Sequence, residues 1–175
     1  MVLFGSANKA RFLFKIEDMK LGVMDFSARE EVSSLYEVDL TVTSEDEIDF
    51  NTVIGKEALL TIIGHETDRY FHGIINQFMQ VGSRGRFFIY QTTLVPSLWL
   101  LSLEQDCRIF QDETVQDIVS KILKEARITS DLFAFRLQNQ YQKRKYCVQY
   151  RETDLNFISR LLEEEGIFYF FEHAS

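Results

Sequence analysis

Hydrophobic and polar residues alternate with a period of two along much of the first hundred residues, which is the pattern of strands with one buried face. The alternation is cleanest over residues 36–43, where the apolar set is Tyr36, Val38, Leu40 and Val42. Phe12, Phe14 and Ile16 follow the same rule. Residues 59–63 form a short, mostly apolar run that ends at Gly64. These segments predict a β-rich first half.

A hairpin is predicted where two strand-like segments flank a loop that contains glycine. Phe71–Gln80 and Arg86–Val95 lie on either side of Val81–Gly85. Pro96 ends the strand region, because proline cannot donate to a sheet ladder. Repeated short strands joined by polar loops, such as the acidic connector Ser44–Asp49, predict an antiparallel sandwich or barrel.

From residue 114 the apolar period becomes that of a helix. Six residues share one stripe, namely Val115, Ile118, Val119, Ile122, Leu123 and Ala126. Thr114 and Asp117 are spaced as in a capping box at its start. A second helix is predicted to be capped by Thr153 and stopped by Gly166. Its expected buried face consists of Leu155, Ile158, Leu161 and Leu162.

Three further segments are predicted to be strands, namely Phe133–Leu137, Lys145–Tyr150 and Ile167–Phe171. The last is apolar throughout and needs cover on both faces. We therefore expect the chain to be a fragment, or this strand to pack on something outside it. The fold class that results is mainly β with α+β. An N-terminal antiparallel barrel-like domain (residues 1–100) is followed by a small α+β domain (residues 101–175).

Charge and composition exclude several classes of partner. The formal net charge is −8, so phosphate backbones repel the chain on average, and no nucleic-acid partner is expected. We interpret the basic run Lys143–Lys145 as a solvated loop. Neither a signal peptide nor an apolar stretch long enough for membrane insertion is visible. Cytoplasmic synthesis is expected, and any export would use a route without a cleaved signal.

Candidate catalytic and metal-binding groups are scattered. His65, His72 and His173 match no zinc spacing, and we expect His72 to be packed or hydrogen-bonded. The two cysteines, Cys107 and Cys147, are expected to be buried free thiols, although a pairing of either with a histidine stays open.

Acidic runs were considered as paired catalytic carboxylates. Glu45–Glu47 fills a loop, and Glu163–Glu165 ends a helix with Arg160 one turn earlier as the simplest partner. No glycine-rich nucleotide motif occurs in the sequence. We therefore predict no enzyme activity, and no catalytic, metal or cofactor-binding residues.

Three motifs in the second half give the chain a specific resemblance. They are Asp106–Gln111, Gln149–Asp154 and Arg160–Gly166, and Phe71–Ile74 and Pro96–Leu101 upstream fit the same pattern. In this order they resemble the VgrG spike proteins of bacterial type VI secretion, whose hub fold is shared with contractile phage tails. Ser97 departs from the pattern, since a bulkier residue is common there.

The resemblance implies a phage tail hub-like fold and a structural role. Implied partners are two further copies in a homotrimer, the hexameric Hcp tube, baseplate proteins, and effectors or their adaptors. It also implies assembly in the cytoplasm, followed by expulsion to the outside or into a target cell. The resemblance places the second barrel, neck and needle of such proteins after this segment, and much of the trimer contact is expected there.

Roles for the motif residues and two alternatives remain to be tested. We expect four apolar motif residues to be core, namely Cys107, Ile109, Phe110 and Val148. Arg108 and Arg151 are expected to satisfy carbonyls or acids inside the domain junction. The first alternative is the hub of a contractile phage tail or related injection particle. The second, less favoured, is a hydrolytic effector, which would need reactive groups that converge.

Overall fold

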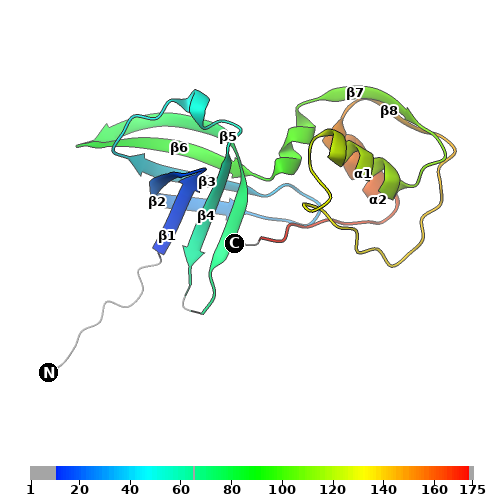
Figure 1. Cartoon of the computed structure of the whole chain (residues 1–175), viewed down its shortest axis with the longest axis horizontal. Helices are drawn as coiled ribbons and strands as arrows, with labels where there is room; N and C mark the ends of the chain where they lie inside the picture. The colour runs from blue at the N-terminus through cyan, green and yellow to red at the C-terminus, as the bar shows by residue number, and fades with distance from the viewer. Residues whose placement is uncertain (1–10, 65, 174–175) are drawn as a thin grey trace. The chain divides into compact units, whose positions relative to one another are not determined.

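A computed structural model describes residues 11–64 and 66–173. The chain separates into two compact units, each described by itself (Figure 1). The first contains residues 11–30, 36–96 and 171–173 of the described chain. The second contains Glu31–Leu35 and Ser97–Phe170. A division into folding domains at residue 100 stays a prediction.

The first unit is a closed antiparallel barrel with the strand order β1-β2-β3-β6-β5-β4. The strands are β1 (Arg11–Ile16), β2 (Met19–Arg29), β3 (Glu37–Ser44), β4 (Glu57–Ile63), β5 (Arg69–Arg84) and β6 (Phe87–Val95). The ladder between β1 and β4 closes the barrel, with Phe14 opposite Leu60. This confirms the predicted barrel-like fold.

The barrel core consists of the inward members of the alternating patterns. Tyr36, Val38, Leu40 and Val42 are all at most 2% exposed, as the period of two predicts. Phe78 stacks on Tyr90 across the interior, with ring centroids 4.8 Å apart. The Tyr90 hydroxyl also accepts a hydrogen bond of 2.8 Å from the Ile48 backbone N–H, which ties the acidic connector to the barrel.

Close packing around Gly73 explains why the Phe71–Ile74 motif needs a glycine at this position. A Cβ atom at this position would lie 2.1 Å from the Val95 carbonyl oxygen and 2.8 Å from the Tyr36 hydroxyl. The same hydroxyl donates a hydrogen bond to the His72 carbonyl, so backbone and side chain meet closely here. The His72 side chain itself is exposed, contrary to the expectation that it would be packed.

The β5–β6 hairpin differs from its prediction. The ladder continues to Arg84 opposite Phe87, so only Gly85 and Arg86 form the turn, and Gly85 has a φ of 62°. Residues 81–84, predicted as loop, are strand. A register shift between Gln80 and Gly82 shows why, because a bulge accommodates the extra residue without ending the pairing.

The second unit combines two short helices with a two-stranded sheet. Helices α1 (Val115–Glu125) and α2 (Asp154–Glu164) start at the predicted caps, Thr114 and Thr153. The Thr114 capping box is present, and Gly166 has a φ of 66°, as its predicted stop position requires. Strand β7 (Gln105–Phe110) pairs with β8 (Cys147–Thr153), and the 3₁₀ helices η1 (Phe50–Thr52, in the first unit) and η2 (Ser97–Ser102) complete the elements.

Two predicted strands are extended but unpaired. Residues 133–137 and 167–171 form no ladder, although exposure alternates along both. Phe133 and Phe135 pack against the core of the second unit, as do Ile167 and Tyr169. The two segments thus show the predicted alternation of exposure, but neither is a strand or has a neighbouring strand among the described residues.

The end of the described chain packs Phe171 on the barrel of the first unit, whereas Phe168 and Phe170 are 66% and 54% exposed, so the expected cover from outside this chain stays a prediction. Phe171 lies edge-on to Tyr36, with ring centroids 5.0 Å apart. His173 contacts the rings of Tyr36 and Phe71 at 4.9 and 4.8 Å, and its Nε2 lies 2.8 Å from a Glu30 carboxylate oxygen. These contacts account for the partial burial of Phe171 and His173.

The barrel closure predicts unequal effects of two leucine substitutions on facing strands. Leu60 is fully buried, whereas Leu13 is 59% exposed. Leu60→Ala is expected to lower the free energy of unfolding by about 2–5 kcal/mol, because it leaves a cavity. Leu13→Ala should change it by less than about 0.5 kcal/mol. Urea unfolding measures both, and equal losses would contradict the barrel register.

Candidate functional site

The residues of the three motifs lie together in the second unit, and two of the motifs meet in a partly buried arginine–carboxylate network. Arg108 on β7 is central. Its Nε lies 2.7 Å from Asp106, its Nη2 lies 3.1 Å from Asp154, and its Nη1 lies 3.3 Å from Glu125. Gln149, fully buried on β8, donates a hydrogen bond of 2.7 Å to Asp154. The network joins both strands to the helices.

The position of Asp154 explains how a carboxylate can be buried here. It is the first residue of α2, where the exposed backbone N–H groups of the helix favour a negative charge. Arg108 donates a charged hydrogen bond to one carboxylate oxygen of Asp154, and Gln149 donates a hydrogen bond to the other. Asp106 lies at the other end of the network, and hydrogen bonds from the Cys107 backbone N–H and from Arg108 lower its pKa. These contacts pair the carboxylates of Asp106 and Asp154 with Arg108.

A second ion cluster holds the end of α2. Arg144 lies 2.6 Å from both Glu164 and Glu165, and Arg160 lies 3.0 Å from Glu164, as its spacing predicted. The hydrogen bond from Arg144 lowers the pKa of Glu164, and Arg160 adds to this shift. Arg144 is only 24% exposed, so the interpretation of Lys143–Lys145 as a simple solvated loop is wrong at its centre.

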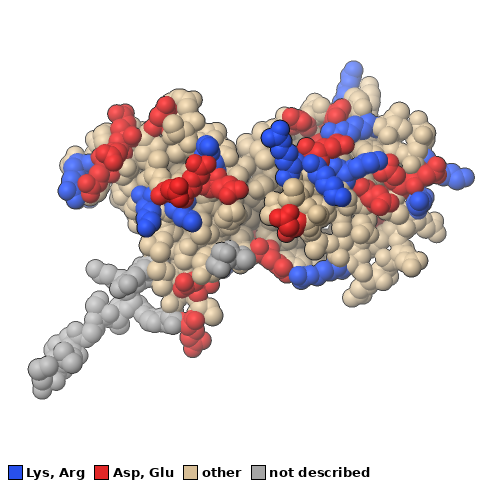
Figure 2. Space-filling view, in the orientation of Figure 1, with Lys and Arg blue, Asp and Glu red and all other residues tan. Residues whose placement is uncertain are grey.

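Acidic and basic side chains lie next to one another over this part of the surface in Figure 2, consistent with such pairing. In the first unit, Glu45 of the other acidic run lies 2.9 Å from Arg86. Three carboxylates of the two acidic runs, Glu45, Glu164 and Glu165, thus form ion pairs with arginines. Among residues 11–64 and 66–173, no three histidine, cysteine or carboxylate side chains converge as a metal site would require. His65 lies outside the described residues.

The outer face of the β7–β8 sheet corrects the core prediction for the motifs. Ile109 is 61% exposed and Val148 is 42% exposed, and the two face each other across the ladder. Cys107, also exposed, faces Tyr150 in the neighbouring pair. Of the four residues expected in the core, only Phe110 is buried, at 6% exposure. The sheet therefore presents an apolar face on its outer side.

Arg151 borders this face and also departs from expectation. Its backbone has a φ of 51°, and its guanidinium lies 5.3 Å from the centre of the Tyr150 ring. No carboxylate in the described chain forms an ion pair with it, whereas Arg108 pairs with three. The acid-satisfying role expected of both arginines holds for Arg108 alone.

Comparison with known proteins now identifies the family. The model of the phage tail baseplate hub (GPD) family matches residues 29–175. The chain belongs to this family. The type VI secretion system spike protein VgrG1b of Pseudomonas aeruginosa is 39% identical over 155 residues, which is 87% of this chain and 21% of that protein. The resemblance to VgrG spike proteins is therefore confirmed.

Two further relatives extend the comparison. A solved structure of the E. coli c3393 protein, described as a type VI secretion component similar to the T4 tail proteins gp27 and gp5, matches this hub chain with a TM-score of 0.84. The identity is 32%, over 91% of this chain and 45% of that one. The actin cross-linking toxin VgrG1 of Vibrio cholerae is 35% identical over 91% of this chain and 15% of its own. The hub chain thus spans about a fifth or less of these two curated relatives.

The orientation of β7 predicts opposite sensitivities at adjacent positions. Phe110 is buried and stacks on Phe157, with ring centroids 5.7 Å apart. Phe110→Ala should lower the free energy of unfolding by about 3–5 kcal/mol. Ile109→Lys should change it by about 0.5 kcal/mol or less, because the side chain already faces solvent. Chemical denaturation followed by circular dichroism tests this, and a large loss for Ile109→Lys would place that residue in the core.

The two thiols are predicted to differ in reactivity. Cys107 is exposed, whereas burial raises the pKa of the Cys147 thiol, and the thiolate is the reactive form. Brief alkylation with iodoacetamide at neutral pH should modify Cys107 and spare Cys147 until the protein is unfolded. Peptide mass spectrometry reads both sites in one sample. Equal modification of the folded chain would show that β7 and β8 are turned differently.

Proposed function

We propose that this chain is the hub segment of a type VI secretion spike and acts as a structural, protein-binding module. The observation that carries the proposal is the 39% identity to a P. aeruginosa spike protein over 87% of the chain. The barrel orders the first unit and the arginine network links elements of the second, and the apolar β7–β8 face provides surface for protein contact. In this role the hub forms a homotrimer, caps the Hcp tube and contacts baseplate proteins.

The same proposal covers where the spike assembles and how it delivers effectors. The spike assembles in the cytoplasm and leaves the cell with the tube, carrying effectors or adaptors bound elsewhere on the longer protein. None of the helices in the described part of the chain is long and apolar enough to cross a membrane. Affinity comes from buried area and repeated symmetric contacts, and this segment makes or breaks no covalent bond.

A phage-like particle is the second candidate. The family model describes phage tail hubs, and the c3393 structure is described as similar to T4 tail proteins. The secretion role is favoured because spike proteins from one organism match at 35–40% identity. Actin cross-linking is named for the Vibrio relative, of which this chain matches 15%, and is not proposed for this segment.

Deletion of the gene that encodes this chain is expected to abolish release of Hcp into the medium while Hcp remains in the cells. The reason is that a tube without its cap does not assemble productively. Immunoblots of medium and cell pellet measure this in a strain without a second spike gene, with the restored gene as the control. Undiminished Hcp in the medium of the deletion strain would refute the secretion role. Sedimentation of the longer protein, with and without Hcp, tests the trimer separately.

A further inference from the structure

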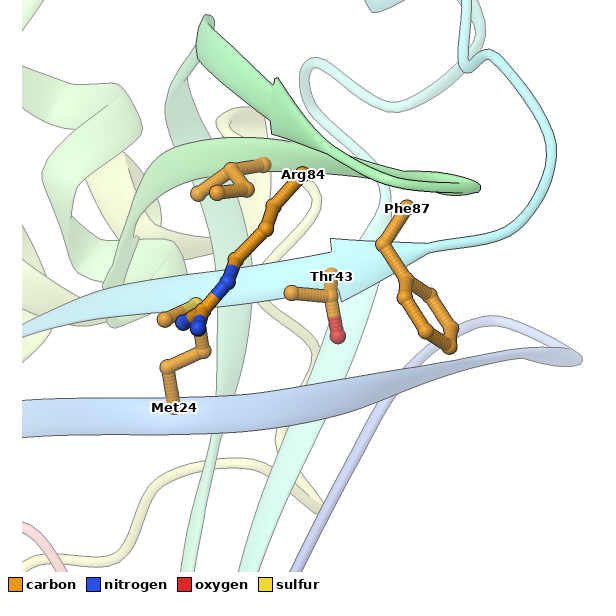
Figure 3. A pocket seen from close by; sticks show the side chains of 5 residues that line it. Met24, Thr43, Arg84 and Phe87 are labelled. Atoms are coloured by element: carbon orange, nitrogen blue, oxygen red, sulfur yellow. The ribbon is translucent and has the colours of Figure 1, made fainter.

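A small hollow lies on the outside of the barrel near the β5–β6 turn. It is lined by Met24, Thr43, Arg84, Phe87 and Ile89 and has a volume of about 160 Å³. Figure 3 shows Arg84 reaching toward Met24, with Phe87 on the far side of Thr43. Met24 is 52% exposed and Phe87 is 37% exposed, so apolar side chains form open walls.

The hollow arises from the register of four strands. One outward-facing row runs from Gly22 through Thr43 and Ile89 to Gly82, each residue opposite the next. Both ends of the row are glycines, which place no side chain beside Thr43 or Ile89. A register shift on either side of Met24 marks a bulge, which re-aims that residue toward the hollow. The two glycines and the bulge thus create the space.

The rim carries a positive charge that the chain does not neutralise. Arg86, two residues along, is paired with Glu45 at 2.9 Å. Arg84 is exposed, and no carboxylate within residues 11–64 and 66–173 pairs with it. Arg84 is therefore, like Arg151 beside the β7–β8 face, a cation without an ion pair in the described chain that lies next to exposed apolar side chains.

We propose that this hollow binds a segment of another protein that presents one aromatic or large aliphatic side chain next to a carboxylate. The volume of about 160 Å³ suits one such side chain, since an apolar cavity of roughly 150 Å³ accommodates benzene. Arg84 supplies the charge that a neighbouring Asp or Glu complements. Apolar surface continues along β5 through Met79 and Val81, which are 50% and 46% exposed, so the surface is longer than a small ligand needs. The proposal does not depend on the secretion role.

The test uses methyl NMR of the chain with a blocked peptide, Gly-Ser-Phe-Glu-Ser-Gly, at millimolar concentration. The methyl signals of Met24, Thr43 and Ile89 are expected to shift and saturate. Replacing the peptide's Phe by Ala should abolish the shifts, and replacing its Glu by Lys should weaken binding by about tenfold. Unchanged binding by either comparison peptide would overturn the proposed chemistry.

Variants of the chain separate binding from folding. Arg84→Glu should weaken binding of the Phe-Glu peptide by about tenfold, while Lys15→Glu, an equal charge change on β1 outside the hollow, should not. Gly82→Leu should fill the hollow and abolish binding without loss of stability, because a Cβ atom there meets nothing within 4 Å. Binding by Gly82→Leu equal to that of the unaltered chain would overturn the site.

Two controls identify the occupant. Shifts of the same methyl signals on raising the chain concentration without peptide would show that a second copy fills the hollow, which overturns the proposal. N-acetylphenylalanine binding as tightly as the peptide would show a small aromatic acid to be the ligand, which overturns it too. Weak binding of this acid and no self-association support a protein segment.

Discussion

The pairing of β1 with β4 is the constraint on which the first unit depends. It closes the sheet and sets which residues of every strand point inward. A slip of one residue would turn Phe14 and Ile16 to solvent and bring Lys15 into the core, at a cost the alternating sequence does not allow. The β2–β3, β3–β6 and β5–β6 ladders place Thr43 and Ile89 on the outside between glycines. The strand pairing of the closed barrel therefore determines both its packed interior and the shape of its outer surface.

In the second unit the equivalent role belongs to Arg108. Besides the apolar core of this unit, polar contacts link its two strands to its helices. Asp154 needs Arg108 because a buried carboxylate without a partner is strongly unfavourable. Gln149 bonds the same carboxylate from the neighbouring strand. Ion pairs and hydrogen bonds therefore link the motif residues Arg108, Gln149 and Asp154, although Oε1 of Gln149 has no hydrogen-bond partner among the described residues.

Prediction from sequence succeeded where the determining contacts are local. Thr114 with Asp117, Thr153 and Gly166 lie within one helical turn of the groups they cap or terminate, and all were placed correctly. Ile109 and Val148 were misplaced because an apolar residue in a strand was read as buried. Exposure alternates along this strand, since Cys147 and Gln149 are buried and Val148 is exposed. The sequence alone does not tell which of the two faces is the buried one, because Gln149 is buried through its hydrogen bond to Asp154. Residues 133–137 failed for a related reason, since strand pairing depends on a neighbour that local sequence does not specify.

The protonation state of the acidic side chains bears on whether this segment can catalyse hydrolysis. A general acid for hydrolysis needs a raised pKa so that it holds a proton near neutral pH. Glu164 has the opposite environment, because hydrogen bonds from Arg144 and Arg160 lower its pKa and keep it ionised. Glu45 and Glu165 are likewise paired with arginines, so the acidic runs are committed to holding loops and a helix end. Arg84 and Arg151 form no ion pair within the described chain and lie beside exposed apolar side chains, a combination typical of protein contacts.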